Sequence, residues 1–405
     1  MTLRISVKFR NLGLVLLFAC ALAVSLRSGD SLRYLDEGDY DQLASSLVHS
    51  RTFAFADGSP TAWRPPGYPA VIAAAYVFVE RPVAAKIENV CILMLATLAL
   101  GTIATRMHAN AGFITPFLMF GYPLLIYAAS VLYPQVLGCL LLTMTVLLLS
   151  GAQLSGRFAV VAGLGYGILI LAIPYFMLML PVLLAYVLFR RDLQRLTRVR
   201  STILFAGAAA LIVMPWTIRN YLDFHAIIPV SANGGWNLFI GNSPDTTPNG
   251  SVDAVNAISL CKRLRPGMSV IEIDRAVGKC AMDWITENPL SAGKLYVGKV
   301  INYFNFRNEL ATKNVATSWS DWLLFVTYYP LLLVVIARAA LFRRFPYNKT
   351  EALIYILYFA NAFFSAIYFT RIRFRIPFDF LLIAVAAGFL CRYWDARHDR
   401  STVNT

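Results

Sequence analysis

The sequence predicts an all-α protein that crosses a membrane many times, and three observations predict it. Of the 405 residues, 58% are hydrophobic and only 14% are charged, whereas soluble domains average about 45–50% apolar and about 25% charged residues. The apolar residues gather in runs that approach the roughly 20 residues needed to cross a bilayer. The basic residues gather in short clusters between these runs, as the positive-inside rule expects.

The formal net charge of +14 raises the alternative of a nucleic-acid-binding protein. Such binding needs basic residues on one contiguous face. Here they are dispersed between apolar segments, so we expect a lipid bilayer and no nucleic acid as the partner of this chain. The four histidines are scattered and no cysteine spacing matches a metal site, so the sequence predicts neither a metal nor a cofactor.

The first predicted span, 12–26, follows a basic N-terminal segment. Ala21-Leu22-Ala23 resembles a cleavage site, so a cleaved signal peptide is the alternative. We favour an uncleaved helix because the many later spans need an orienting first one. The further predicted spans are 88–105, 113–129, 136–150, 158–173, 175–189, 201–216, 320–337, 352–369 and 376–391.

Segment 66–80 decides the topology. If it lies in the interface or re-enters, the basic residues at 106, 157, 190–200, 338–349 and 392–400 fall on the side of the N-terminus. If it crosses, every later loop changes side, unless 158–189 forms one long kinked helix. The charge asymmetry therefore predicts about ten spans plus one interfacial or re-entrant helix. Pro174 and Pro181 predict a break within 158–189.

This topology divides the chain into three regions. Residues 1–216 form an N-terminal membrane core with a first outer loop at 27–87, residues 217–319 form an extracytoplasmic subdomain, and residues 320–405 form the last spans and a cytoplasmic tail. Helical patterns are expected at 269–287 and 291–306. Cys261 and Cys280 share the subdomain, where a disulfide and two free thiols are equal alternatives.

An acidic motif, Asp36-Glu37-Gly38-Asp39-Tyr40-Asp41, lies just beyond the first span. Charged side chains beside lipid are energetically costly, so such a cluster at the membrane face indicates a catalytic site. Transfer of a sugar from a phosphate-linked donor needs a carboxylate to take the acceptor's proton. Asp36 and Glu37 are the predicted catalytic carboxylates. The alternative is a solvated loop in which Asp39 caps a helix that begins near Tyr40.

The same chemistry needs cations that stabilise the departing phosphate. Arg64, Arg373 and Arg375 are the predicted phosphate binders, because a guanidinium group matches phosphate oxygens bidentately. Arg64 precedes Pro65-Pro66, and the alternative for it is an interfacial anchor. The alternative for Arg373 and Arg375 is an ordinary basic loop. This alternative is weakened because the two residues lie on the side of the membrane where few positive charges are expected.

Six further side chains are expected to line a substrate cavity near these groups. For Tyr133 and Gln135 the alternative role is an interhelical hydrogen bond. For Trp236 and Asn237 the alternative role is packing in the core of the loop. The six are Tyr40, Tyr68, Tyr133, Gln135, Asn233 and Trp236.

These motifs together, in their order, resemble the GT-C glycosyltransferases that use polyprenyl-phosphate sugars, in the branch of the protein O-mannosyltransferases and the aminoarabinose transferases of lipid A. The resemblance covers nearly the whole chain. It rests on Asp36-Glu37-x-x-Tyr40, Arg64-Pro65-Pro66-Gly67-Tyr68-Pro69, Pro215-Trp216-Thr217-Ile218-Arg219-Asn220-Tyr221, Pro229-Val230-Ser231-Ala232-Asn233-Gly234-Gly235, Gly241-Asn242 and Arg373-Phe374-Arg375-Ile376-Pro377.

The resemblance implies a GT-C helical core with juxtamembrane helices in the first outer loop. It also implies a sugar donor on undecaprenyl or dolichyl phosphate, Asp36 as the base and Arg64 on the donor phosphate. The acceptor, a protein, lipid or glycan, stays open. We expect a bacterial inner membrane with the site on the periplasmic side. The chain departs from the family's pattern at Gln135, where relatives often have an acidic residue, at Ile173, where a cation is common, and near Asp379.

Two other functions compete with this one. A transporter or flippase of lipid-linked saccharide would place its charges near the bilayer midplane and often shows inverted repeats, neither of which the sequence indicates. A catalytically silent GT-C scaffold is favoured by the departures at Gln135 and Ile173, whereas the intact pair of Asp36 and Arg64 argues against it.

Overall fold

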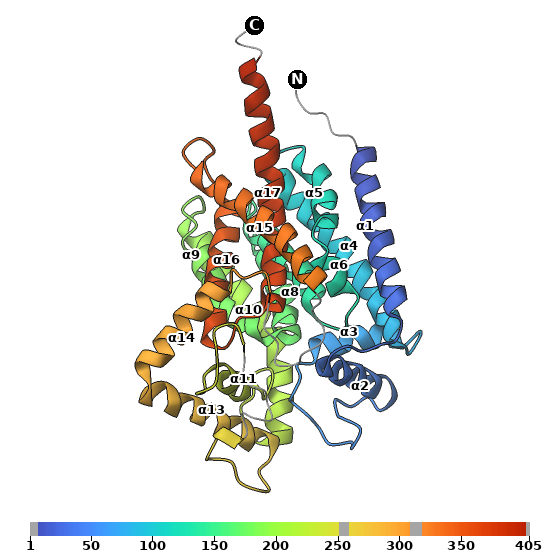
Figure 1. The fold of residues 1–405 in the computed structure, drawn as a ribbon, viewed down its shortest axis with the longest axis vertical. Helices are drawn as coiled ribbons and strands as arrows, with labels where there is room; N and C mark the ends of the chain where they lie inside the picture. The colour runs from blue at the N-terminus through green and yellow to red at the C-terminus, as the bar shows by residue number, and fades with distance from the viewer. Residues whose placement is uncertain (1–6, 251–258, 308–317, 402–405) are drawn as a thin grey trace.

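The computed structural model describes residues 7–250, 259–307 and 318–401, and it confirms the predicted all-α fold. Within these residues the only strand-like pairing is an isolated bridge between Ala54 and Pro60. Figure 1 shows the helices as a bundle with the two termini at the same end. The helices are α1 (Val7–Ser28), α2 (Leu35–His49), α3 (Gly67–Tyr76), α4 (Pro82–Met107), α5 (Ala111–Phe120), α6 (Leu124–Ala129), α7 (Gln135–Leu149), α8 (Gly156–Ala172), η1 (Pro174–Met179), α9 (Leu180–Leu188), α10 (Arg195–Phe224), α11 (Gly234–Gly241), α13 (Val270–Glu287), α14 (Pro289–Asn302), α15 (Ser318–Ala340), α16 (Lys349–Ile367) and α17 (Ile372–Ser401).

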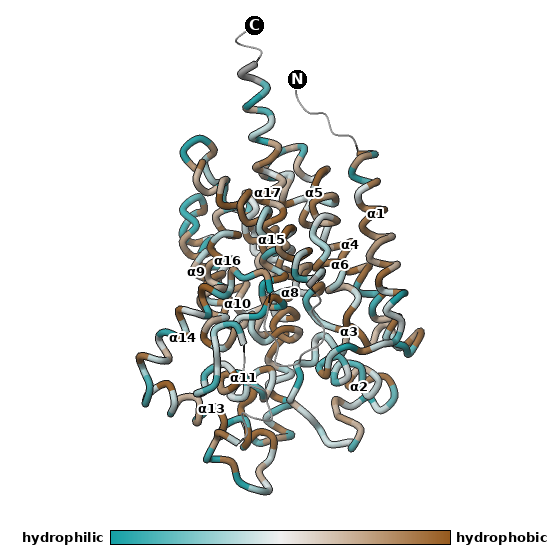
Figure 2. Tube along the Cα trace, in the orientation of Figure 1, coloured by the Kyte–Doolittle hydropathy of each residue, from teal (hydrophilic) through white to brown (hydrophobic). Residues whose placement is uncertain are grey.

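Six of these helices, α1, α4, α10, α15, α16 and α17, are long and apolar enough to cross a membrane, and shorter apolar helices accompany them. The chain is therefore a multi-pass membrane protein. Figure 2 shows hydrophobic residues along the packed helices and more hydrophilic ones in the loops at both ends. α17 forms the centre of the bundle, where it packs against α4, α5, α7, α15 and α16.

Two predicted spans are not continuous helices. The span predicted at 113–129 is divided into α5 and α6, because Pro123 has no backbone N–H to continue the α5 ladder. The span predicted at 175–189 begins as the 3₁₀ helix η1 and becomes α9 only at Leu180. α8 ends at Ala172, which confirms the break predicted from the prolines within 158–189.

Three helices begin or end away from the predicted positions. α10 continues to Phe224, past the boundary expected at 216. α17 begins at Ile372, so the late arginine motif lies in its first turn and not in a loop. α2 begins at Leu35, with Tyr34 as its N-cap residue, so the expectation that Asp39 caps a helix starting near Tyr40 is wrong.

Arg106, Arg190 and Lys349, from three of the basic clusters, lie together at one end of the bundle, which we call the basic end. Arg106 donates a hydrogen bond to the carbonyl of Leu147, and Arg190 donates to the carbonyl of Leu149, so α4, α7 and the α9–α10 turn meet there. Lys349 of α16 pairs with Asp192 in that same turn, at 2.7 Å. This is the arrangement expected if segment 66–80 does not cross. α3, with its 10 residues, is about 15 Å long, half the thickness of the bilayer core.

The opposite end carries α2, α3, α11, α13 and α14 (Figure 1). α11 packs directly on α13 at Gly235. A Cβ atom at this position would lie only 2.0 Å from the carbonyl oxygen of Asp274, so the close approach requires glycine. Lys299 of α14 is buried and donates to the side chain of Asn242 and to the carbonyl of Tyr368, at 2.9 and 2.7 Å. This lysine fastens the outer helices to the end of α16.

Cys261 and Cys280 form a disulfide across 19 residues of the outer region. A cross-link of this loop length stabilises a fold by about 3 kcal/mol through loss of chain entropy in the unfolded state. We expect Cys280→Ser to open α13 to proteolysis and hydrogen exchange, while Cys91→Ser, at an exposed free cysteine, changes neither. Equal protection of α13 in the two variants would show that the disulfide does not stabilise this region.

Candidate functional site

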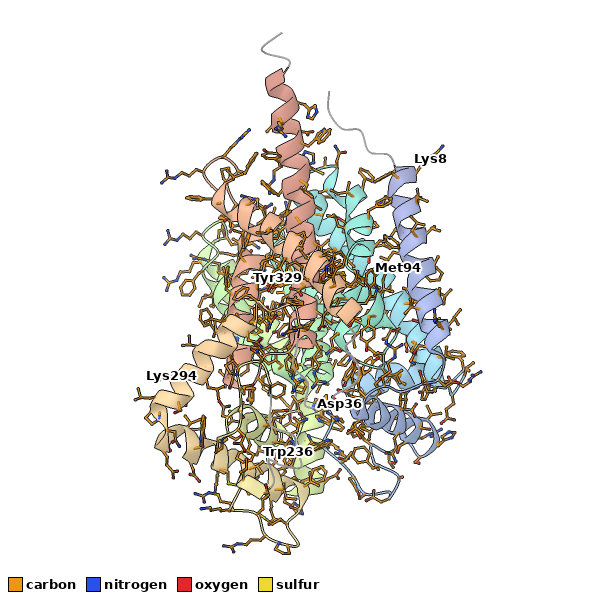
Figure 3. The ribbon with its side chains drawn as sticks, viewed as in Figure 1. Lys8, Asp36, Met94, Trp236, Lys294 and Tyr329 are labelled. Carbon is orange, nitrogen blue, oxygen red and sulfur yellow. A yellow bond between two sulfur atoms is a disulfide. The ribbon has the colours of Figure 1, made fainter. Side chains whose placement is uncertain are left out.

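A cavity of about 390 Å³ opens at the end of the bundle opposite the basic end. Figure 3 shows Asp36 and Trp236 toward this end, far from Lys8. The wall of the cavity comes from α2, the loop before α3, the start of α7, η1, the loop before α11, and the α16–α17 junction. Its lining includes apolar side chains, such as Ile173, Met177 and Leu178, and polar ones, which we call together the polar wall. A cavity that joins an apolar surface to a few converging polar groups is typical of a ligand site.

Asp36 lies at the polar wall between two guanidinium groups. Its Oδ1 atom accepts a hydrogen bond from Arg64 at 2.5 Å, and its Oδ2 atom accepts from Arg373 at 2.8 Å. The hydroxyl of Tyr133 donates to the same Oδ2 atom at 3.0 Å. Four segments far apart in the chain therefore meet at this one carboxylate: α2, the loop before α3, the segment before α7 and the start of α17.

Asp39 completes the group from the next turn of α2. Residues three apart on a helix are neighbours on one face, and Arg64 bridges the two carboxylates, since its Nε atom donates to Asp39 at 2.8 Å. The ring of Tyr40 lies 5.7 Å from the guanidinium carbon of Arg64. Sequence reasoning gave Asp39 only a capping role. The spacing of three from Asp36 was the signal that could have placed both residues beside Arg64.

The charges of the site reinforce one another. Burial alone would raise the pKa of the Asp36 carboxyl, but Arg373 and Arg64 hold this pKa at about 2. Burial opposes the charged form of Arg64, and Asp36 and Asp39 outweigh it, so the pKa of Arg64 lies above its usual value. Burial raises the pKa of Tyr133, which keeps its hydroxyl protonated as a donor to Asp36. The resting site is therefore a network of ion pairs.

Glu37, predicted as a second catalytic carboxylate, is fully buried and does not line the cavity. Its Oε1 atom accepts from the backbone N–H groups of Arg33 and Tyr34, at 2.8 and 3.1 Å. Its Oε2 atom accepts from the N–H of Leu132 at 2.8 Å. These contacts join the start of α2 to the segment that leads into α7, so Glu37 holds Asp36 and Tyr133 in register.

Arg375, predicted as a phosphate binder, does not line the cavity and is fully buried. It pairs with Asp379 at 2.8 Å and donates to the carbonyl of Asn305 at 2.8 Å. Its guanidinium carbon lies 3.7 Å from the centre of the Tyr328 ring. Because these contacts occupy its guanidinium group, Arg375 stabilises the packing of α17 and does not contribute to the cavity.

The predicted cavity residues divide into two groups. Tyr40, Tyr133, Gln135 and Asn233 line the cavity, whereas Tyr68 and Trp236 do not. Tyr68 is buried, where it accepts a hydrogen bond from Asn89 and packs edge-on against Tyr40. Trp236 packs edge-on against Trp63. Lining residues that sequence reasoning missed are Tyr175, Ser231, Asn237, Ser365, Tyr368 and Phe369.

Tyr133 both lines the cavity and makes the polar hydrogen bonds between helices that were its alternative role. The hydroxyl of Tyr133 contacts Asp36 and Arg373. The side-chain oxygen of Gln135 is buried and has no hydrogen-bond partner within the described part of the chain.

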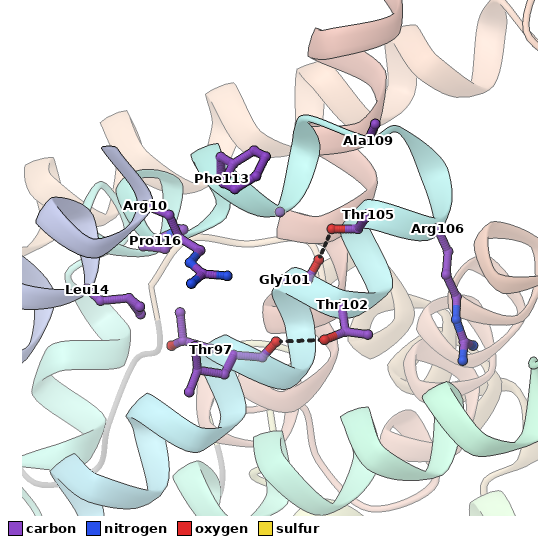
Figure 4. Close-up of a pocket in the computed structure, with 12 residues that line it drawn as sticks. Arg10, Leu14, Thr97, Gly101, Thr102, Thr105, Arg106, Ala109, Phe113 and Pro116 are labelled. Carbon is purple, nitrogen blue, oxygen red and sulfur yellow. Dashed lines mark hydrogen bonds between the residues drawn. The ribbon is translucent and has the colours of Figure 1, made fainter. Parts of the chain in front are cut away.

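A second cavity, of about 450 Å³, lies at the basic end between α1, α4 and α5 (Figure 4). The hydroxyls of Thr102 and Thr105 donate to carbonyls of their own helix, those of Leu98 and Gly101. The residues that line this cavity include Arg10 and Arg106 but no carboxylate. In the residues that the structure describes, no group of three or more His, Cys, Asp or Glu side chains is placed to hold a metal ion.

Comparisons with known proteins find similarity to solved structures. No family model matches the chain, and no curated protein matches it. Two solved structures that match are those of ArnT from Cupriavidus metallidurans, bound to undecaprenyl phosphate and in the apo state. Their sequence identities are 18% and 17%, they cover 92% of this chain and 77% and 76% of ArnT, and both have a TM-score of 0.44. This identity is too low to transfer an activity.

Proposed function

We propose that this protein is a membrane glycosyltransferase that moves a sugar from a polyprenyl-phosphate donor to an acceptor at the end of the bundle opposite the basic end. The observation that supports this most is a carboxylate, Asp36, held between Arg64 and Arg373 in the lining of a cavity that also has apolar lining residues. A lipid phosphate needs both surfaces, because its headgroup is anionic and its chain is apolar. The family resemblance of the motifs points to the same donor.

In the proposed reaction, Arg64 and Arg373 bind the phosphate, and Ile173, Met177 and Leu178 contact the first isoprene units. The acceptor's hydroxyl oxygen attacks the anomeric carbon of the sugar, and the bond from this carbon to the phosphate oxygen breaks. The phosphodiester, with one negative charge, leaves as a phosphomonoester with two. The hydroxyl proton passes to Asp36, so that charge moves from the carboxylate to the phosphate while the two arginines stabilise it.

Because Asp36 is paired with arginines in the resting site, donor binding would also change how basic Asp36 is. A carboxyl with a pKa of about 2 is a weak base. The donor phosphate competes with Asp36 for Arg64 and Arg373, and whatever share of these contacts it takes makes Asp36 more basic. Asp39 keeps its contact with Arg64 during this exchange, which holds the guanidinium group in place. The carboxylate is thus a stronger base when the donor is bound than in the resting site.

This arrangement predicts how the pH profile responds to loss of one arginine. Because the folded-state pKa of Asp36 lies below the ordinary value of a carboxyl, the carboxylate persists until the pH falls toward about 2. Wild-type kcat/KM should therefore show no acid limb between pH 4.5 and 8. A neighbouring cation lowers a carboxyl pKa by about 1–3, so Arg373→Gln should move the acid limb from about 2 up to about 3–5. At the upper end of that shift the limb reaches the acid edge of the range, so the profile is measured down to about pH 3.

Two variants control the pH experiment. Arg373→Lys keeps the positive charge and should keep the flat acid side, while Arg397→Gln removes an exposed arginine near the C-terminal end of α17. An acid limb that does not move in Arg373→Gln would contradict the assignment of Asp36 as the base.

The function itself is tested with the full chain reconstituted in liposomes together with a membrane extract as the source of acceptor, and supplied with radiolabelled polyprenyl-phosphate sugars. We expect one donor class to be consumed with release of free polyprenyl phosphate, and Arg64→Gln to raise the donor KM at least tenfold, the loss of a charge-assisted contact. If no donor is consumed while the labelled lipid crosses the bilayer, the protein is a transporter. If neither happens, the proposal fails in favour of a silent scaffold.

A further inference from the structure

Gln135 is a cavity residue whose hydrogen bonding is incomplete. It is the first residue of α7, two positions after Tyr133, and only 5% of it is exposed. Its Oε1 atom is buried without a partner in the described part of the chain, although such an acceptor is costly to leave unpaired. A ligand group that donates a hydrogen bond would satisfy this atom. A sugar hydroxyl is such a donor.

The charged side chains that line the cavity are already paired with one another. Among the described residues that line it, the charged side chains are Asp36, Arg64 and Arg373. Both oxygens of Asp36 contact the arginines, and Asp39, behind them, is paired with Arg64. The proposed chemistry assigns the arginines to the phosphate and Asp36 to the acceptor's proton. An ammonium group on the sugar would meet two guanidinium groups and find no carboxylate of its own.

The rest of the polar wall is uncharged. Besides Gln135 it includes Ser231, Asn233 and Asn237. Amides and hydroxyls both donate and accept, which suits the hydroxyls of a sugar ring. The amide of Asn233 donates to the carbonyl of Trp63 at 3.0 Å, so this part of the wall is fixed in place before a ligand binds.

We infer that the sugar on the donor is uncharged, a neutral pentose or hexose, and that the amide of Gln135 selects it by accepting a hydrogen bond from one of its hydroxyls. This inference rests on the proposed function and specifies its substrate. A neutral amide favours a hydroxyl, whereas a carboxylate at the same position would favour an ammonium group.

The test uses the reconstituted full chain with the same acceptor extract and three donors on one polyprenyl phosphate. The donors carry a neutral hexose, the same hexose with one hydroxyl replaced by an amino group, and the corresponding uronic acid. Release of polyprenyl phosphate gives kcat/KM for each. We expect the wild type to favour the neutral donor over both charged ones by at least tenfold. Gln135→Glu, close in size, should move the ratio of amino to neutral sugar upward by at least tenfold.

Gln153→Glu is the matched control, because it makes the same change at an exposed position in the α7–α8 loop. Gln135→Met removes the acceptor without adding charge and should lower kcat/KM for the neutral donor about tenfold, the value of a hydrogen bond whose partner is left unpaired. Size-exclusion profiles and melting temperatures establish that each variant is folded. A folded Gln135→Met with wild-type kcat/KM would overturn the inference.

Two other results would also overturn it. One is a wild type that consumes a charged-sugar donor as fast as the neutral one, or faster, in which case the proposed function stands and only the neutral sugar is wrong. The other is a Gln135→Glu variant whose donor ratio changes no more than that of Gln153→Glu. If the wild type releases polyprenyl phosphate from none of the donors, the proposed function falls and the inference falls with it.

Discussion

Asp36→Asn should reduce sugar transfer by about 10²–10⁴-fold, the usual contribution of a general base. Asparagine has nearly the same shape, and its oxygen still accepts a hydrogen bond, but it cannot take the acceptor's proton. The substitution also removes the anion that competes with the phosphate for Arg64 and Arg373. We therefore expect the variant to bind polyprenyl phosphate at least as tightly as the wild type while kcat falls.

This opposite effect on binding and turnover separates a catalytic role from a structural one. Purified variants are compared by donor turnover and by direct binding of polyprenyl phosphate, with melting temperature as the measure of folding. Asp39→Asn is the matched control, because Asp39 lies on the same helix, contacts the same arginine and does not line the cavity. It should raise the donor KM with little change in kcat. Equal turnover by Asp36→Asn and the wild type would refute the assignment of the base.

The pair of Asp36 and Arg64 could be predicted because both residues stand beside membrane segments, where an unpaired charge is costly and a functional reason is expected. The different roles of Arg373 and Arg375 could not. In an outer loop, Arg-x-Arg presents two equivalent cations. In the first turn of a helix, residues two apart point about 200° apart, so Arg373 faces the cavity and Arg375 faces the interior. The difference depends on where α17 begins.

The positions where helices end are also difficult to predict from the sequence. Hydropathy locates the apolar part of α10 but not its last turns, because Arg219 and Asn220 are polar. They remain helical because they find partners in other segments: Arg219 donates to the carbonyl of Thr61, and Asn220 to that of Ile228. In contrast, 113–129 is apolar throughout and still breaks before Leu124. Apolar character predicts where the chain meets lipid, whereas backbone hydrogen bonds decide where a helix ends.

Arg375→Met should unfold much of the protein, because it leaves the Asp379 carboxylate in the apolar interior without its partner. Breaking a buried ion pair in this way costs about 3–5 kcal/mol. Arg375 contacts Asp379 at 2.8 Å, both side chains are at most 2% exposed, and the hydroxyl of Tyr122 also donates to Asp379. We expect a strong loss of folded protein from membranes and a lower melting temperature in detergent.

The double variant Arg375→Met/Asp379→Leu decides what the pair does. Replacing both partners of a buried ion pair with apolar side chains of similar volume is often neutral for stability, so the second substitution should restore most of the folded protein. The restored protein should bind donor with nearly the wild-type KM, because neither residue lines the cavity. Arg64→Gln should show the reverse pattern, a high donor KM in a protein of normal stability. A well-folded Arg375→Met with a raised donor KM would instead mean that the Arg375 guanidinium reaches the phosphate, and that the first turn of α17 rearranges when the donor binds.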